Sequence, residues 1–387
     1  MLRVLHVLPS IAPDRGGPSR SVMGLAQAEA HAGASVEFVA AHDIGAVATV
    51  SRGGVKLSGG RQFLAPFEIP GIGLAATLWK SIGRADIVHL HSVWNGVISL
   101  SEIFCRIRHV PYVLSPRGML DAHNMERRRS LKKAAYRVLE HGNIAGVAGW
   151  HFLDLSEREG CSWLPAAANA RNVLIAPNGL DVAAIRGSAE RPRASFLSDQ
   201  TGEINLVFLG RIHPIKGLDL ALEAVRTLAD SGVRCVLHLI GPDDGCLTNL
   251  LDRARTLQIA DRVRHLGAIY GEERFSILRN ADAVILTSHY ECNSVTAAET
   301  LAAGGLLIAT DTCHMEVARS AGAAVVVPRD RFKVADAVRE WVNDSARSGN
   351  VRERARGFAQ DHLAWPPLAE RMIEFYHRVL GHPQCAG

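Results

Sequence analysis

The chain has 387 residues, too many for one ordinary hydrophobic core and suited to two domains of roughly 150–200 residues each. Hydrophobic residues make up 48% and charged residues 21%, which excludes a disordered chain, and the net charge is only +4. Seven cysteines lie scattered without a C-x-x-C pair, which argues against a zinc site or a disulfide framework and for reduced thiols in a cytosol.

The apolar runs carry no membrane signal. The first nine residues are too short in their apolar part for a signal peptide and read as a first buried strand. No apolar run approaches the roughly 18–20 residues of a membrane span. We therefore expect a cytoplasmic protein.

Short β-rich runs alternate with helical patterns along the whole chain, which is typical of parallel α/β layers. Two series of similar length predict two doubly wound, Rossmann-like domains with a boundary near residue 180, and residues 218–228 show the apolar stripe of a helix that packs on a sheet. The predicted strands are 3–8, 36–40, 87–90, 112–114, 147–151 and 173–176 in the first half, and 205–209, 233–240, 263–266, 283–286, 306–309 and 323–327 in the second.

Two glycine patterns in the first half have different meanings. Gly16 and Gly17 follow the first predicted strand, where a missing Cβ lets backbone amides approach a diphosphate; the alternative is a plain surface turn. Residues 71–76 match the dinucleotide fingerprint G-x-G-x-x-A, but they follow the proline-flanked segment 66–70, which cannot be a central strand. We therefore predict no NAD or FAD site.

Polar side chains gather at the end of the third predicted strand. His89 and His91 alternate on one strand face, a pattern that can bind a metal, but no third ligand is apparent in the sequence. One of the two can equally be a buried, hydrogen-bonded histidine. Trp94 and Asn95 follow at the same strand end, where an indole can stack on a ligand and an amide can hydrogen-bond to it.

Residues 126–137 form a basic stretch with an apolar stripe at helical spacing. One reading is a solvated helix face; the other is attraction to anionic lipid headgroups or to a lipid-linked diphosphate. Nucleic acid is not an expected partner, because no aromatic residues interleave the cations.

Two cations follow the first strand of the second half. Arg211 and Lys216 come two and seven residues after that strand, so both reach the carboxyl edge of the sheet, where ligands of open α/β sheets bind. A nucleoside diphosphate leaving group needs cations in order to depart without a metal. Arginine grips such a group bidentately, whereas lysine acts as a movable point charge.

Two glutamates flank the start of a later helix. Glu291 and Glu299 lie eight positions apart after the strand 283–286, so they cannot share a helix face; we place Glu291 in the loop and Glu299 in the helix. Asn293 or Ser294 can cap that helix. The backbone amides of Asn293, Ser294 and Val295 suit a phosphate or sugar, and the carboxylates suit sugar hydroxyls. The combination predicts a nucleotide-sugar site.

Four motifs in this order resemble those of the retaining glycosyltransferases of family 4. They are the pair Glu291 and Glu299, the loop 209–217 with Arg211 and Lys216, the hinge-like segment 176–181, and the glycine loop 16–18. The resemblance implies the GT-B fold, with two Rossmann-like domains facing each other across a cleft. Residues 1–180 would bind the acceptor, residues 181–365 would bind the nucleotide-sugar donor, and a helix within 366–387 would cross back to the first domain.

The resemblance also implies residue roles. Glu299 would accept hydrogen bonds from the ribose hydroxyls, and Glu291 would contact the donor sugar. Residues 292–296 depart from the family's usual Gly-Phe-Gly pattern. Arg117 stands where the family commonly has an acceptor-side histidine, and His123 follows six residues later. Either His123 serves that role or Arg117 binds a donor phosphate or an anionic acceptor. With this resemblance, we predict that His91, Trp94 and Asn95 contact an acceptor sugar, through stacking by the indole and hydrogen bonding by the others.

These observations predict a hexosyltransferase that needs no metal or other cofactor. It would move a hexose from UDP- or GDP-sugar to a saccharide or lipid-linked saccharide, in cell-surface polysaccharide synthesis at the inner face of the plasma membrane. The alternatives are a degenerate nucleotide-sugar-binding subunit and a nucleotide-sugar epimerase on the same fold. A phosphorylase is disfavoured, because no pyridoxal lysine motif is apparent.

Overall fold

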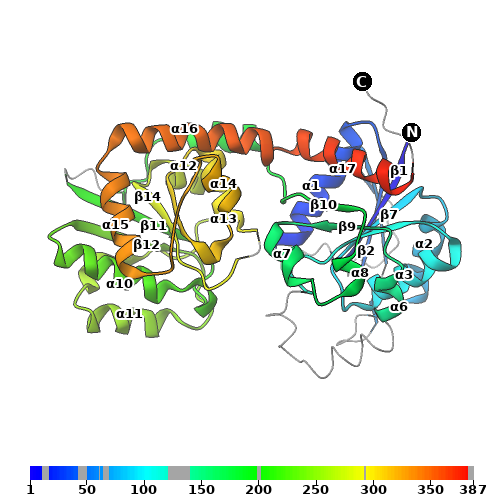
Figure 1. The fold of residues 1–387 in the computed structure, drawn as a ribbon, viewed down its shortest axis with the longest axis horizontal. Coiled ribbons are helices and arrows are strands. Elements are labelled where there is room, and N and C mark those ends of the chain that lie inside the picture. Colours follow the sequence, from blue (N-terminus) through cyan, green and yellow to red (C-terminus); the bar gives the residue numbers. More distant parts are fainter. Residues whose placement is uncertain are drawn as a thin grey trace. The chain divides into compact units, whose positions relative to one another are not determined.

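The computed structural model describes residues 1–10, 17–41, 50–60, 62–63, 69–120, 140–197, 202–291 and 293–381 (Figure 1). The chain forms two compact units, Met1–Gly179 with Trp365–Gly387, and Leu180–Ala364. Each unit is a Rossmann-like layer structure with a mainly parallel sheet and helices on both faces. The fold class predicted from the sequence is confirmed.

The sheet of the first unit runs parallel except at one edge. Its strands are β1 (Arg3–Ser10), β2 (Ser35–Ala41), β3 (Val50–Arg52), β4 (Val55–Gly60), β7 (Ile87–His91), β8 (Tyr112–Ser115), β9 (Gly149–Phe152) and β10 (Val173–Ile175). Their order is β10-β9-β8-β7-β1-β2-β4-β3, with β3 antiparallel to β4. A separate short pair, β5 (Gln62–Phe63) and β6 (Ile69–Pro70), lies outside this sheet.

Helices cover both faces of this sheet. They are α1 (Gly17–His31), α2 (Ile72–Ile82), α3 (Gly96–Arg108), α6 (His141–Ala145), α7 (Leu155–Gly160), α8 (Pro165–Ala168) and α17 (Trp365–Val379). Helices α1 and α17 pack side by side on one face, and α2 and α3 pack on the other (Figure 1). The last helix of the chain therefore belongs to the core of the first unit, where Phe375 and Tyr376 are fully buried.

The second unit has a wholly parallel sheet in the order β13-β12-β11-β14-β15-β16. Its strands are β11 (Glu203–Leu209), β12 (Arg234–Ile240), β13 (Val263–His265), β14 (Ala283–Leu286), β15 (Leu307–Thr310) and β16 (Val325–Val327). Its helices are α9 (Val182–Ala189), α10 (Leu218–Asp230), α11 (Leu247–Thr256), α12 (Glu273–Asn280), α13 (Val295–Ala303), α14 (Glu316–Ser320), α15 (Arg331–Val342) and α16 (Ser345–His362), with 3-10 turns at Pro214–Lys216, Ala260–Arg262 and Asp311–Cys313.

All twelve predicted strands are present, with ends within two residues of the predicted ones. The predicted helix 218–228 is α10, whose apolar stripe is buried against the sheet. Strands β3 and β4 were not predicted. Four of the eleven residues 50–60 are glycines, which weaken the apolar alternation that marks a strand.

The strand order defines where each unit can bind a ligand. In the first sheet the chain order reverses between β1 and β7, and in the second sheet it reverses between β11 and β14. Open α/β sheets bind ligands at the carboxyl ends of the strands beside such a reversal. Most of the predicted site residues lie at or after the ends of these four strands, whereas Arg117 follows β8.

Two predictions from the sequence concern a membrane: the absence of a spanning segment and the basic stretch 126–137. Within the described ranges, no helix is both long enough and apolar enough to cross a bilayer. The basic stretch 126–137 lies outside the described residues, so its two interpretations, a solvated helix face and a surface that attracts anionic lipid, both stay open. His123 also lies outside the described residues, and its predicted role on the acceptor side stays open.

Candidate functional site

A tight loop after β11 carries the two predicted cations. The ring of His213 accepts a hydrogen bond from the Ile215 N–H at 3.1 Å and so begins the short 3-10 turn that ends at Lys216. Gly217 then adopts the left-handed conformation, with φ of 58°, and α10 begins at the next residue. The turn fixes the backbone of Lys216 at the carboxyl edge of the sheet.

The side chain of Lys216 meets Glu291 across the point where the strand order reverses. Lys216 Nζ lies 2.5 Å from Glu291 Oε1, and the hydroxyl of Ser288 donates to the same oxygen at 2.7 Å. The loop after β14 is fastened to the lysine loop by a backbone hydrogen bond from the His289 N–H to Ile215 O, 2.8 Å long. Two residues predicted separately from the sequence are thus brought together.

Gly217 is required by the contact between these two loops. A Cβ at this position would lie 2.2 Å from the carbonyl oxygen of Thr287, so Gly217→Ala must push the two loops apart. We expect it to lower the free energy of unfolding by about 1–3 kcal/mol, measured by chemical denaturation. Gly232→Ala is the matched control, because φ is also positive there (76°) but nothing lies within 4 Å of the added carbon. Equal losses in the two variants would contradict the close approach.

Helix α13 begins beside Glu291. Ser294 is its N-cap, and its hydroxyl accepts from the Ala297 N–H at 3.3 Å. Asn293 precedes it with a positive φ of 67°, a conformation that non-glycine residues rarely adopt. Val295 is the first helical residue and is 47% exposed. The helix thus begins directly after the loop that carries Glu291, and the binding of a phosphate or sugar by its backbone amides stays a prediction.

Glu299 lies within α13, as predicted, but it is not an isolated carboxylate. It is 5% exposed and forms a bidentate ion pair with Arg274 of α12, with distances of 2.9 Å to Nε and 2.7 Å to Nη2. The sequence analysis missed Arg274. The two residues come from different helices, and no local spacing rule relates positions 25 apart.

Removing Arg274 should lower the stability of the protein strongly, because the buried carboxylate of Glu299 loses its partner. We expect Arg274→Ala to lower the free energy of unfolding by about 3 kcal/mol. Arg253→Ala is the control, since its pair with Glu223 is half exposed and should contribute well under 1 kcal/mol by denaturation. Comparable losses for the two arginines would show that the Arg274 pair is no stronger than a surface pair.

Arg211 lies at the rim of the same edge. Its side chain is 64% exposed, and Nη1 lies 2.5 Å from Asp244 Oδ2. Both predicted phosphate-binding cations of the second unit are therefore paired with carboxylates: Lys216 with Glu291, and Arg211 with Asp244. An anionic ligand must exchange with or add to these partners.

In the first unit the reversal lies between β1 and β7. Gly17 is the first residue of α1, directly after the undescribed segment that contains Gly16. Helix α1 is 15 residues long, so its start offers backbone N–H groups at the carboxyl end of β1. This placement agrees with a role for Gly17 near a phosphate, which stays a prediction.

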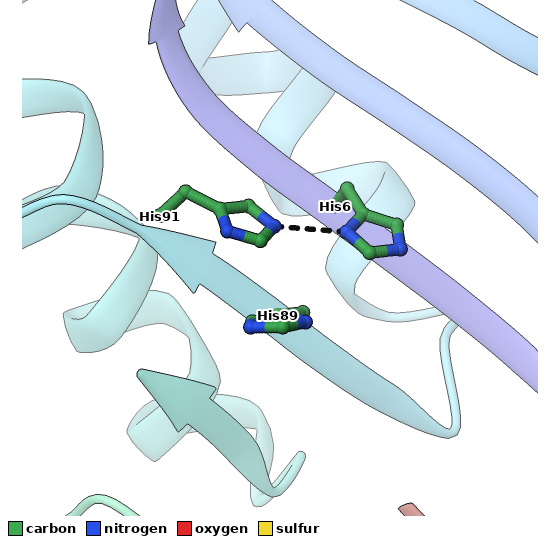
Figure 2. A group of neighbouring side chains, drawn as sticks. All are labelled: His6, His89 and His91. Carbon is green, nitrogen blue, oxygen red and sulfur yellow. Dashed lines mark hydrogen bonds between the residues drawn. The ribbon is translucent and has the colours of Figure 1, made fainter. Parts of the chain in front are cut away.

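The structure adds a third histidine to the predicted pair. His6 of β1 lies beside His89 and His91 of β7, and the three side chains are completely buried (Figure 2). One ring nitrogen of each histidine lies within 4.8 Å of one nitrogen of each of the other two. His6 Nδ1 and His91 Nε2 are 2.9 Å apart in rings only 7° from coplanar. The sequence analysis missed His6, because its contact with His89 depends on the register of two strands 80 residues apart.

Arg117 joins this group from the end of β8. Its Nε lies 3.3 Å from His91 Nδ1, and its Nη1 lies 2.9 Å from Asn178 Oδ1 and 3.3 Å from Ser21 Oγ. His91 is therefore buried beneath Arg117, and any contact between His91 and an acceptor would be made through the guanidinium.

The loop that presents Arg117 is held by a buried carboxyl. Glu157 accepts hydrogen bonds from the backbone N–H groups of Gly118 and Leu153, both 2.6 Å long. Burial nonetheless raises the pKa of Glu157 to about 7, and these two hydrogen bonds oppose that rise. Glu157 thus holds the loop that carries Arg117, through the N–H of the next residue, Gly118.

Trp94 and Asn95 have structural partners of their own. The indole N–H of Trp94 lies 3.3 Å from the carbonyl oxygen of Met119. The side-chain oxygen of Asn95 accepts from the Val97 N–H at 2.9 Å and caps α3, a role the sequence analysis did not assign. Their predicted contacts with an acceptor stay predictions.

Backbone strain concentrates around this edge of the first sheet. Ser92, Trp94 and Arg117 have positive φ values of 83°, 61° and 54°. Such conformations cost roughly 1–3 kcal/mol each and cluster at functional sites in proteins. The local geometry thus supports a functional role for the carboxyl ends of β7 and β8.

The buried histidines titrate abnormally. Burial and the neighbouring His151 lower the pKa of His89 well below 6.5, and burial, His89 and Arg117 do the same to the pKa of His91. Burial and Arg117 lower the pKa of His151 to about 3. These three rings are therefore neutral at physiological pH.

Two family models match most of the chain. The "Glycosyl transferase 4-like domain" matches residues 16–179, and "Glycosyl transferases group 1" matches residues 193–358. A D-inositol 3-phosphate glycosyltransferase of Paenarthrobacter aurescens is 26% identical over 97% of each chain. A glycogen synthase of Mycobacterium tuberculosis is 29% identical over 207 residues, and the match spans only 53% of this chain and 48% of that protein.

Solved structures share the fold at low sequence identity. Anabaena Alr3699/HepE in complex with UDP and glucose has a TM-score of 0.69 at 15% identity, covering 97% of this chain and 99% of that one. A structure described as trehalose-6-phosphate from E. coli bound with UDP-2-fluoro glucose has a TM-score of 0.72 at 14% identity, covering 97% and 98%.

Proposed function

Because the chain belongs to the group 1 glycosyl transferases and has the two Rossmann-like units of the GT-B fold, we propose that it is a retaining, metal-independent hexosyltransferase. Its donor is a UDP- or GDP-sugar, and its acceptor is a saccharide or a lipid-linked saccharide in the assembly of a cell-surface polysaccharide. The basic stretch 126–137 is proposed to contact anionic lipid headgroups at the membrane surface.

The contact between Lys216 and Glu291 carries this proposal. It joins a cation suited to a diphosphate and a carboxylate suited to sugar hydroxyls, and each follows one of the two strands beside the reversal. A nucleotide sugar needs both groups within a few ångströms, because its diphosphate is bonded directly to the anomeric carbon. The fold supports a nucleotide-sugar donor as well, since two solved structures with the same fold are complexes with UDP or a UDP-sugar.

The proposed reaction assigns a task to each residue. The bond between the anomeric carbon and the diphosphate oxygen breaks, and its electron pair leaves with the diphosphate, whose charge Lys216 and Arg211 neutralise. The acceptor oxygen bonds to the same face of the anomeric carbon and passes its proton to the departing phosphate oxygen. Glu291 and Glu299 hold the hydroxyls of the donor sugar and of the ribose, and Arg117 binds on the acceptor side.

A thermal-shift screen tests the donor class. Purified protein is heated with UDP, GDP, ADP, TDP or CDP, each with and without EDTA. Because a ligand of the folded state raises the melting temperature by mass action, we expect a rise with UDP or GDP that EDTA leaves unchanged. A rise that EDTA abolishes would contradict the metal-independent reaction.

Turnover of the matching nucleotide sugar separates the proposed transfer from its alternatives. Incubation with the sugar nucleotide and a mixture of saccharide acceptors should release nucleoside diphosphate and give a product heavier by one hexose. Binding without release of the diphosphate would indicate a degenerate subunit. An isomeric nucleotide sugar would indicate an epimerase.

A further inference from the structure

The three histidines of Figure 2 belong to a longer hydrogen-bonded network on the α1 and α17 face of the first sheet. We use the term histidine network for six side chains: His6, His89, His91, His151, Glu29 of α1 and Tyr376 of α17. All six side chains are at most 2% exposed. The contacts, from one end to the other, are Arg117 to His91 Nδ1, His91 Nε2 to His6 Nδ1, His6 Nε2 to Glu29, Glu29 to Tyr376, Tyr376 to His89 Nδ1, His89 Nε2 to His151 Nδ1, and His151 Nε2 to Ala176 O.

The direction of the hydrogen bonds in one half is set by Arg117. A guanidinium can only donate, so His91 Nδ1 must accept and the proton of that ring must sit on Nε2. His91 Nε2 then donates to His6 Nδ1 at 2.9 Å, and His6 Nε2 donates to Glu29 Oε2 at 2.7 Å. Arg117, His91 and His6 thus point their donors one way, toward Glu29.

The other half starts from a carbonyl oxygen, which can only accept. His151 Nε2 donates to Ala176 O at 3.0 Å, which consumes the proton of a neutral His151. Three contacts remain: His151 with His89 at 3.3 Å, His89 with Tyr376 at 2.7 Å, and Tyr376 with Glu29 at 3.0 Å. Each of these contacts needs one hydrogen.

The two halves meet at Glu29 through different oxygens. His6 Nε2 donates to Glu29 Oε2, and the Tyr376 hydroxyl donates to Glu29 Oε1. The hydrogen positions of His6 and His91 are therefore set by Arg117 at one end and by Glu29 at the other.

A metal ion at the three histidines is disfavoured by the same contacts. His6 and His91 direct their nitrogens at each other within one plane, and a metal ligand would need both lone pairs directed at a third point. The remaining nitrogens of His6, His89 and His91 also have hydrogen-bond partners. Arg117 would repel a divalent ion beside His91.

We propose that Glu29, as the acceptor of the His6 Nε2–H, fixes the hydrogen positions of His6 and His91 and thereby keeps His91 Nδ1 as a hydrogen-bond acceptor that positions Arg117. The inference rests on the proposed function for the role of Arg117 at the acceptor side. His91, His6 and Glu29 act through the arginine and are positioning residues. A proton added to His91 would turn its Nδ1 into a donor and set a second cation against Arg117.

Ring-nitrogen NMR of protein labelled with ¹⁵N-histidine tests the proton positions without any activity assay. At neutral pH we expect His91 and His151 to be neutral with the hydrogen on Nε2, and His6 to carry a hydrogen on Nε2. Single histidine substitutions assign the signals. A hydrogen on Nδ1 of His91, or none on Nε2 of His6, would overturn the proposal. Titration of EDTA-treated protein with ZnCl₂ should leave these signals unchanged, and stoichiometric zinc binding at them would also overturn it.

Substitutions of Glu29 test the positioning role. Glutamine keeps an oxygen that can accept from the His6 Nε2–H, so Glu29→Gln should keep the hydrogen of His91 on Nε2 and rescue transfer. Glu29→Leu has no acceptor and should lower kcat by roughly 10–100-fold through displacement of Arg117, with KM for the donor unchanged. Tyr376→Phe, a milder change, should lower kcat less and move the pH profile.

The outcomes separate the inference from the function. Equal kcat in Glu29→Leu and wild type would overturn the positioning role. Loss of kcat in Glu29→Gln equal to that in Glu29→Leu would also overturn it. If the wild-type protein transfers no sugar, the proposed function fails, while the NMR spectra still decide on the protons.

Discussion

Lys216→Ala is expected to weaken the binding of a nucleoside diphosphate by about 10–100-fold, while leaving the affinity for the corresponding nucleoside unchanged. A charge-assisted hydrogen bond contributes about 1.5–3 kcal/mol, and only the diphosphate can receive one from Lys216. The turnover number should fall by roughly 10²–10³-fold, because the negative charge of the leaving group grows in the transition state. Calorimetric titration and initial rates measure the two effects.

Lys333→Ala is the control, since Lys333 is an exposed lysine of the same unit on α15. A second control, Glu291→Gln, removes the partner carboxylate and keeps the lysine. If Lys216→Ala weakens the nucleoside as much as the diphosphate, the effect comes from a disturbed loop and not from a lost phosphate contact.

The second large effect is an acid limit on the stability of the first unit. Below about pH 4.5 we expect its free energy of unfolding to fall by about 4 kcal/mol per pH unit. The cause is the depressed pKa of three buried histidines, His89, His91 and His151, which take up protons in the unfolded chain but not in the folded one. The unfolded state then binds about three more protons than the folded state.

In two buried carboxyls the pKa is raised, so their effect on stability has the opposite sign to that of the histidines. The change in stability per pH unit therefore differs between pH ranges. Burial raises the pKa of Glu157 to about 7 and, together with Glu140, raises the pKa of Glu102 well above 4.5. Between pH 4.5 and 6.5 these carboxyls keep protons that the unfolded chain has lost, which offsets two of the three histidines. Above pH 6.5 Glu102 alone dominates, and stability should fall by about 1.4 kcal/mol per pH unit. Stability should therefore peak near pH 6.5.

Hydrogen exchange measures each unit separately, through peptides from β1 and β7 in the first unit and from β11 and β12 in the second. The second unit is an internal control, because burial lowers the pKa of one histidine there, His238, to about 4. Its acid slope should be about one third as steep. Glu102→Gln should abolish the decline above pH 6.5, and a decline that persists in this variant would contradict the assignment to Glu102.

The elements that the sequence predicts correctly are those governed by local periodicity. The strand 283–286 and the helix at 218–228 each bury a continuous run or stripe, and such patterns are decided by residues within a few positions. The placement of Glu291 in a loop and Glu299 in a helix follows from the same rule and is confirmed. Ser294, one of two candidate caps, is the cap that the structure has.

The parts that the sequence does not predict depend on pairing between distant segments. His6 lies opposite His89 because β1 pairs with β7 in one particular register, and a shift of one residue would turn the ring to the other face. Tyr376 comes from the last helix, 287 residues after His89. Arg274 reaches Glu299 only because α12 packs on α13. No window of local sequence contains these contacts.

The two points at which the chain passes from one unit to the other adjoin each other, so the second unit can be exchanged as one continuous segment. The chain enters the second unit at Leu180 and leaves it at Ala364, and the Leu180 N–H donates to Leu363 O at 2.7 Å, so the two ends lie together. In the first unit, the indole of Trp365 lies against Gly179, where a Cβ would be 2.3 Å from the ring. Recombination between relatives at these two adjoining points would exchange the whole 180–364 segment and leave every strand of the first sheet intact. Under the proposed function, donor preference is expected to move with the exchanged segment.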